Sequence, residues 1–267
     1  MAPTPDGTPI WADAMFPDLD GAKRFYGDLF GWTFEGGDPQ YGGYTQALSD
    51  GKRVAAVVPQ MPGMEGVPPS WTLYFSSADI KATTERIRTA GGTTDMEPMQ
   101  VGEFGSMLIA KEPSGVQFGV WQPGTHPGFE KQNEPGSFAW AEVTTREAAK
   151  ADAFFPAVFD YKVQRMEDDK IDFHLWSLPG AKEPALGRFR MTEDVPAEVP
   201  PYINVYFAVD DCDEAVGKVT GAGGTVHFGP MTSPFGRFAT VSDPQGASFA
   251  VIDLATMEGD MPKVSPV

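Results

Sequence analysis

Cysteine and histidine are scarce in this chain of 267 residues, which contains one cysteine, Cys212, and three histidines. A single cysteine excludes a disulfide within the chain and fits a reducing compartment, and we expect its thiol to be a small buried helix residue. No apolar run reaches the roughly 18 residues that a membrane-spanning helix requires. The N-terminus also lacks the basic and apolar segments of a secretory signal, so we expect a cytoplasmic protein.

Positive charge is also scarce, because 20 Lys and Arg residues stand against 37 Asp and Glu residues and give a formal net charge of −17. Such a charge repels phosphate backbones and anionic lipid headgroups, so we expect neither nucleic acid nor a membrane as a partner. It is also an ordinary device for solubility. The hydrophobic content of 41% is too high for disorder, and the length permits two domains.

An internal repeat organises the sequence. Residues 10–32 and the segment that begins at Phe138 align without a gap at an offset of 129 positions. The matched pairs are Trp11 with Trp140, Asp13 with Glu142, Phe25 with Phe154, Tyr26 with Phe155 and Phe30 with Phe159. A self-match of this length predicts two copies of one module, and the period is far above that of solenoid repeats. We expect each copy to be a domain with a separate core.

Each copy reads as two units of one strand, one helix and three strands. Residues 10–16 alternate and predict a strand. The apolar spacing over residues 19–30 predicts a helix that begins after Asp18 and ends at Gly31. The remaining strands of this unit are expected at residues 32–35, 42–48 and 53–58, with a tight turn at Asp50-Gly51.

The second unit follows a Pro- and Gly-rich loop over residues 59–70. It has a strand at residues 71–75, a helix capped by Asp79, and strands at residues 93–97, 104–110 and 116–121. The second copy repeats this order. We predict a first domain over residues 1–122, a linker over 123–136, a second domain over 137–254 and a polar, mobile tail over 255–267.

These units carry recurring motifs, namely AKRFYGDLFGW, VYFAVDDCDEAV and SDPQGASFAV. A chain with such motifs resembles the vicinal oxygen chelate superfamily of glyoxalase I, extradiol dioxygenases and bleomycin-resistance proteins, and more closely its tandem glyoxalase-like members. The resemblance implies an α+β fold of two tandem domains. Each domain would be a pair of βαβββ units that form a cup-shaped mixed sheet with helices outside, and a ligand or metal would lie in the cup.

The resemblance also implies where a metal would be held. Counting from the helix caps, the Phe-Tyr pair and the Pro-x-Gly turn places these residues at the ligand positions: Trp11, Thr72 and Gly119 in the first copy, and Trp140, Asn204 and Ala250 in the second. They cannot supply the three or more donors that a divalent ion needs. His126 lies in the linker, and neither His174 nor His227 occupies a ligand position. We therefore predict no metal and no cofactor.

Alternation along the first strands places one tryptophan and one carboxyl group together on the inner face of each cup. Gly119 and Ala250 would leave room there for a flat organic ligand. The candidate ligand-binding residues are Trp11, Asp13, Thr72, Tyr74, Gly119 and Trp121 in the first copy, and Trp140, Glu142, Asn204, Tyr206 and Ala250 in the second. The tryptophans could instead fill the cups as structural plugs.

Three functions follow in order of preference. The first is a metal-free protein that binds a planar aromatic small molecule, such as an antibiotic or a natural-product intermediate. The second is a metal-independent enzyme, or an accessory to an oxygenase, in natural-product metabolism, with Asp13 or Glu142 as general acid or base. The third is a metal-dependent lyase or dioxygenase. A partner enzyme of the same pathway is a further candidate partner. The ligand, the number of active cups, catalysis and the oligomeric state stay open.

Overall fold

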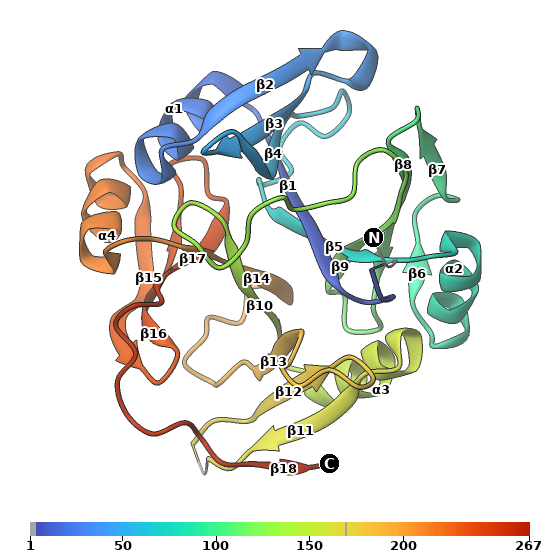
Figure 1. Ribbon diagram of the computed structural model, residues 1–267, viewed down its shortest axis with the longest axis vertical. Helices are drawn as coiled ribbons and strands as arrows, with labels where there is room; N and C mark the ends of the chain where they lie inside the picture. The colour runs from blue at the N-terminus through green and yellow to red at the C-terminus, as the bar shows by residue number, and fades with distance from the viewer. Residues whose placement is uncertain (1–3, 169) are drawn as a thin grey trace.

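The computed structural model describes residues 4–168 and 170–267, and four strand–helix–strand units form a ring in it (Figure 1). The first unit contains β1 (Pro9–Phe16), α1 (Leu19–Phe30), β2 (Thr33–Asp38), a 3₁₀ turn (Pro39–Tyr41), β3 (Tyr44–Ser49) and β4 (Lys52–Pro59). The second contains β5 (Trp71–Ser76), α2 (Ile80–Thr89), β6 (Thr93–Thr94), β7 (Met99–Val101), β8 (Gly105–Lys111) and β9 (Gln117–Pro123).

The second copy repeats this order. The third unit contains β10 (Phe138–Thr145), α3 (Ala148–Phe159), β11 (Lys162–Met166), β12 (Phe173–Ser177) and β13 (Leu186–Arg190). The fourth contains β14 (Tyr202–Ala208), α4 (Cys212–Gly221), β15 (Thr225–Ser233), β16 (Gly236–Ser242) and β17 (Ser248–Asp253), and β18 (Val264–Pro266) closes the chain. None of the helices in the described ranges is long and apolar enough to cross a membrane.

Each pair of units shares one mixed sheet of nine strands, which confirms the predicted α+β architecture with helices outside. In the first sheet β1 pairs in parallel with β4 and antiparallel with β5, and in the second β10 pairs in the same way with β13 and β14. The first strands of the two units therefore lie side by side at the centre of each sheet. The side chains of these strands that point away from the helices form the inner face of the cup.

The first helix shows why the local prediction succeeds. The Asp18 side chain accepts a hydrogen bond from the backbone N–H of Gly21, which satisfies one of the free donors at the helix start. Gly31 ends the helix in the left-handed conformation, with φ of 70°. Asp79 and Asp211 cap α2 and α4 in the same way, and Cys212 is the buried helix residue that we expected.

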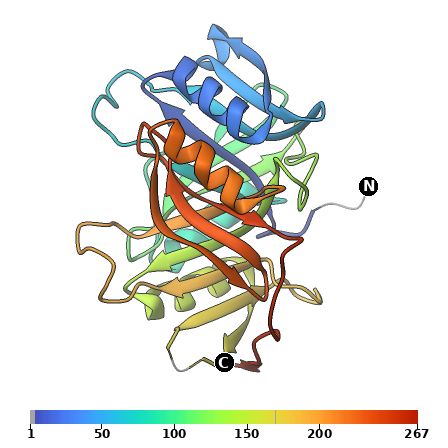
Figure 2. The same ribbon diagram turned by 90° about the vertical axis from the view of Figure 1, so that its left-hand side faces the viewer.

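The expectation of two separate cores is wrong, because the helix-side faces of both copies belong to one continuous hydrophobic core. Phe30 of α1 lies 5.3 Å from Phe207 of β14, measured between ring centroids, and Phe118 of β9 lies 5.3 Å from Phe155 of α3. Aromatic side chains of α1 and of α3 therefore pack on strands of the other copy. Figure 2 shows α1 and α4 side by side at this junction.

Polar contacts accompany the shared core. The hydroxyl of Tyr26 donates to Oδ2 of Asp243 at 2.9 Å, and Nε1 of Trp71 donates to the same hydroxyl at 3.1 Å. The side chain of Gln245, in the Pro-x-Gly turn before β17, bonds both the N–H and the C=O of Asp18. The last turn of one copy is thus fixed to the first helix of the other.

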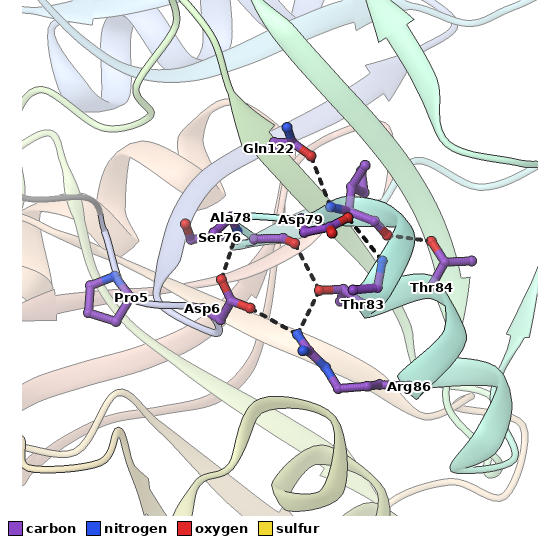
Figure 3. Close-up of polar contacts among 12 residues, drawn as sticks. Pro5, Asp6, Ser76, Ala78, Asp79, Thr83, Thr84, Arg86 and Gln122 are labelled. Carbon is purple, nitrogen blue, oxygen red and sulfur yellow. Dashed lines mark hydrogen bonds and ion pairs between the residues drawn. The ribbon is translucent and has the colours of Figure 1, made fainter.

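The N-terminal segment is fixed to the start of α2 (Figure 3). Oδ1 of Asp6 accepts from the backbone N–H of Ala78 at 2.7 Å, and Oδ2 accepts from Arg86 at 2.9 Å. Arg86 also donates to Oγ1 of Thr83, while Oε1 of Gln122 accepts from the backbone N–H of Ile80. These contacts join the segment before β1, the helix α2 and the end of β9.

Two local predictions need correction. The strand expected over residues 93–97 is only two residues long, and an additional strand, β7, pairs with β8. The tail is not wholly free, because β18 pairs antiparallel with β11 and adds a ninth strand to the second sheet. Its partner edge lies far away in sequence, so the composition of the tail could not indicate this pairing.

Candidate functional site

The inner face of each cup is built by alternation along the first strand. In β1, Ala12 and Ala14 belong to the helix-side core, whereas Trp11 lies in a separate cluster on the inner face, with Asp13 next to it. In β10 the same alternation places Trp140 and Glu142 on the inner face. Trp11 lies opposite Tyr74, and Trp140 lies opposite Tyr206.

In the first cup, hydrogen bonds connect an indole, two phenols and a carboxyl group. Nε1 of Trp11 donates to the hydroxyl of Tyr44 at 2.6 Å, and this hydroxyl donates to Oδ2 of Asp13 at 3.1 Å. The hydroxyl of Tyr74 donates to Oδ1 of Asp13 at 3.3 Å. Burial raises the pKa of Asp13 to about 7, although the two tyrosine hydrogen bonds lower it in part.

Residues 124–131, which we call the cover segment, close this cup. The ring of His126 meets Trp11 edge-on, with 4.4 Å between ring centroids, and Phe129 lies 5.6 Å from Trp11. Nε1 of Trp121 donates to the carbonyl of His126, and the N–H of Phe129 donates to the carbonyl of Ile10. As a result only 3% of Trp11 is exposed. Burial lowers the pKa of His126 to about 4, so its ring is neutral at pH 7.

The second cup has a similar centre but fewer internal hydrogen bonds. The hydroxyl of Tyr206 donates to Oε2 of Glu142 at 2.9 Å. Burial raises the pKa of Glu142 to about 7, against the lowering effect of Tyr206 and Trp140. Asn204 lies opposite Glu142 in the strand register and is 4% exposed. Its Oδ1 has no hydrogen-bond partner among the residues that the structure describes.

Aromatic and methionine side chains extend the second cup outward along β15 and β16. Phe238 lies 6.1 Å from Tyr206 and 5.9 Å from Phe228, measured between ring centroids. Phe228 is 53% exposed and Met231, which pairs with Phe238, is 40% exposed. Trp140 is half-buried. The second cup therefore presents apolar surface that the first cup covers with its own chain.

All eleven predicted site residues lie on the inner faces of the two sheets, and cross-strand pairing brings them together. The pairs are Trp11 with Tyr74, Asp13 with Thr72, Tyr74 with Gly119, Trp140 with Tyr206, Glu142 with Asn204 and Tyr206 with Ala250, while Trp121 follows Gly119 on β9. The room expected at Gly119 is absent, because a Cβ there would overlap the ring of Tyr74.

Several residues of these faces were missed by the sequence analysis: Tyr44, His126 and Phe129 in the first cup, and Tyr202, Phe228 and Phe238 in the second. Tyr44 could have been found, because it lies in a predicted strand whose alternate residues face the cup. His126 and Phe129 lie in a segment without periodicity, so only the path of the folded chain reveals them.

The positions at which the resemblance implies metal ligands do not fit a metal ion. The indole nitrogen of Trp11 is a donor that bonds Tyr44, and the ring of Tyr74 fills the space beside Gly119. Within residues 4–168 and 170–267, no group of three His, Cys, Asp or Glu side chains is placed to hold a metal. His174 lies on the helix side, 3.0 Å from Asp152, and His227 is exposed.

Two comparisons identify the family. Residues 11–120 match the model of the Glyoxalase/Bleomycin resistance protein/Dioxygenase superfamily. The anthracycline biosynthesis protein DnrV of Streptomyces peucetius is 38% identical over 266 residues, which cover 93% of this chain and 94% of DnrV. The chain belongs to this superfamily. The anthracycline biosynthesis protein DauV of Streptomyces sp. strain C5 is 37% identical, with the same coverage of both chains.

Other relatives have different names. A Mycobacterium bovis protein called "Putative glyoxylase CFP32" is 35% identical over 94% of this chain and 97% of its own length. Among solved structures, the 2,3-dioxygenase LapB of Pseudomonas sp. KL28 has a TM-score of 0.66 at 15% identity and covers 97% of this chain and 95% of LapB. The Mn(II)-bound glyoxalase of Novosphingobium aromaticivorans has a TM-score of 0.64 at 16% identity, with 96% and 87% covered. At such identities these two structures show the fold alone.

Proposed function

We propose that this protein binds a planar, largely apolar aromatic molecule against the inner face of a sheet, without a metal ion. One observation carries the proposal: each cup holds a carboxyl group that is half-buried among aromatic side chains, is hydrogen-bonded to tyrosine and has a pKa of about 7. A neutral carboxylic acid both donates and accepts hydrogen bonds. Few polar groups on an apolar wall are typical of a small-molecule site.

The relatives support the same class of ligand. Two of them are named for anthracycline biosynthesis, and anthracyclines are built on a planar, polycyclic aromatic system. Such a ring system would stack on an indole and bury its apolar faces, while its hydroxyl and carbonyl groups would meet the carboxyl group and the tyrosines. A pathway enzyme that delivers or removes the molecule is a natural partner for such a protein.

A second candidate function is metal-independent acid–base catalysis by Asp13 or Glu142. It is favoured by the pKa of about 7, since a general acid or base works best near the operating pH. Asp13→Asn and Glu142→Gln separate the two functions. A catalyst would lose on the order of 10²–10⁴ in turnover while it still binds substrate. A binding protein would lose at most about 1.5–3 kcal/mol of affinity.

Native mass spectrometry and elemental analysis of protein purified from its own host test the proposal. We expect a co-purified aromatic molecule and no stoichiometric Zn, Ni, Fe or Mn, because the positions that would hold a metal carry Trp11, Thr72 and Gly119 and their repeats. One tightly held metal ion per domain, lost together with activity in a chelator, would refute the proposal.

A further inference from the structure

The two cups differ in how their carboxyl groups receive hydrogen bonds. Both oxygens of Asp13 accept from tyrosines, whereas Glu142 accepts from one tyrosine, Tyr206. The reason lies in the sequence, because Phe173 occupies the position that repeats Tyr44 and has no hydroxyl. Its ring lies over Gly187 instead. The second cup therefore lacks the tyrosine hydroxyl that links the indole to the carboxyl group in the first cup.

The cups differ also in the segment that follows their last strand. After β9 the cover segment packs His126 and Phe129 onto Trp11. After β17 the chain carries Met257 and Met261, which are 54% and 61% exposed. The indole of Trp140 is therefore half-buried, whereas the chain itself covers the indole of the first cup.

Asn204, in the second cup, has a buried side-chain oxygen that receives no hydrogen bond from the described residues. It lies in β14, in register with Glu142, and its Oδ1 is buried without a donor among the described residues. A buried carbonyl oxygen without a partner lowers stability, and a bound donor would recover that loss. The first copy has Thr72 at this position, half-buried and opposite Asp13. This acceptor is thus specific to the second cup.

The surroundings of Asn204 define the chemistry that would satisfy it. Trp140 and Phe238 flank the cup with aromatic surface and favour a planar body. An acceptor at the floor of the cup needs an O–H or N–H group at the edge of that body. We propose that Asn204 is the specificity-determining residue of the second cup, and that it accepts a hydrogen bond from the hydroxyl of a planar phenolic ligand. This inference rests on the proposed function.

Calorimetric titration at pH 6 with 2-hydroxyanthraquinone and with 2-methoxyanthraquinone tests the inference, because only the first compound can donate. We expect the wild type to prefer the hydroxy compound. Asn204→Leu, which is similar in size, should abolish that preference by weakening the binding of the hydroxy compound roughly 2- to 13-fold, the range expected for one neutral hydrogen bond. Thr89→Val, at an exposed position of α2 outside both cups, should leave both affinities unchanged.

If Asn204→Leu does not fold, Asn204→Val, which is smaller and has no hydrogen-bonding group in its side chain, should abolish the preference equally. A preference for the hydroxy compound that survives these changes at residue 204, or that disappears in Thr89→Val, would overturn the assignment while leaving the proposed function intact. Failure of the wild type to bind either compound would instead count against the proposed function itself, and this inference would fall with it.

Discussion

At the scale of single residues, the two half-buried carboxyl groups of the cups have the clearest physical consequences. Asp13 and Glu142 lie at equivalent positions of the repeat, and burial raises the pKa of both to about 7. The alternation of the first strand was sufficient to place them beside a tryptophan. The raised pKa values could not be foreseen, because they depend on the covering side chains, among them Tyr44 and His126, whose positions follow from strand register and chain path.

The pH dependence of stability tests the state of Asp13. The folded chain keeps a proton on this group up to about pH 7, whereas the unfolded chain releases it near the ordinary value of 3.8. The stabilising contribution is therefore fully present below pH 3.8 and is lost as the pH rises toward 7. Between pH 5 and pH 8 the wild type should lose more unfolding free energy than Asp13→Asn, by at most about 3 kcal/mol.

Urea unfolding at several pH values measures this difference. Asp28→Asn, which removes an exposed carboxylate from α1, serves as the control and should keep the wild-type slope. Equal slopes for the wild type and Asp13→Asn would show that the buried carboxyl group titrates normally, contrary to our account.

At the scale of elements, the first helix and the turn before the last strand carry different side chains in the two copies. Tyr26 of α1 donates to Asp243 in the turn before β17. The equivalent pair is Phe155 of α3 and Glu112, which is 2% exposed and has an Oε2 without a partner among the described residues. The repeat in the sequence matched Tyr26 with Phe155, and it matched the two Pro-x-Gly turns with each other. It did not indicate that each helix meets the turn of the other copy.

Exchanging the tyrosine and the phenylalanine at these two contacts should change the free energy of unfolding in different ways. Tyr26→Phe should lower the free energy of unfolding by roughly 1–3 kcal/mol, because it leaves Asp243 and the indole N–H of Trp71 without partners. Phe155→Tyr brings a hydroxyl toward Glu112 and should be neutral or slightly stabilising. Chemical denaturation of both variants measures the two values. A larger loss for Phe155→Tyr than for Tyr26→Phe would contradict the equivalence of the junctions.

At the scale of the whole molecule, one hydrophobic core spans both copies, and we expect them to unfold together. Spacing along α1 and α3 predicted correctly which side chains are buried, namely Phe25, Tyr26, Phe154 and Phe155 among others. A helical stripe reveals that a face is covered but not by which surface, so the contact of Phe30 with Phe207 had no sequence signal. The resemblance supplied the architecture, since the repeated unit order specifies how strands pair.

Scanning calorimetry checks this cooperativity. The full chain should unfold in one transition whose calorimetric and van't Hoff enthalpies agree. Fragments 1–122 and 137–254, produced separately, should lack cooperative unfolding, because each would expose the aromatic face that the other covers. If each fragment unfolds cooperatively near the melting temperature of the full chain, each copy has a core of its own, contrary to our account.

Binding of an aromatic ligand without a metal ion is the core of the proposed function. The most direct test is calorimetric titration of 2-hydroxyanthraquinone into the full chain, before and after exhaustive treatment with EDTA. We predict the same affinity and one site per chain under both conditions, with quenching of the fluorescence of Trp140, because no metal ligand set exists at Trp140, Asn204 and Ala250. Binding that disappears in EDTA and returns on addition of Mn²⁺ or Zn²⁺ would contradict the account.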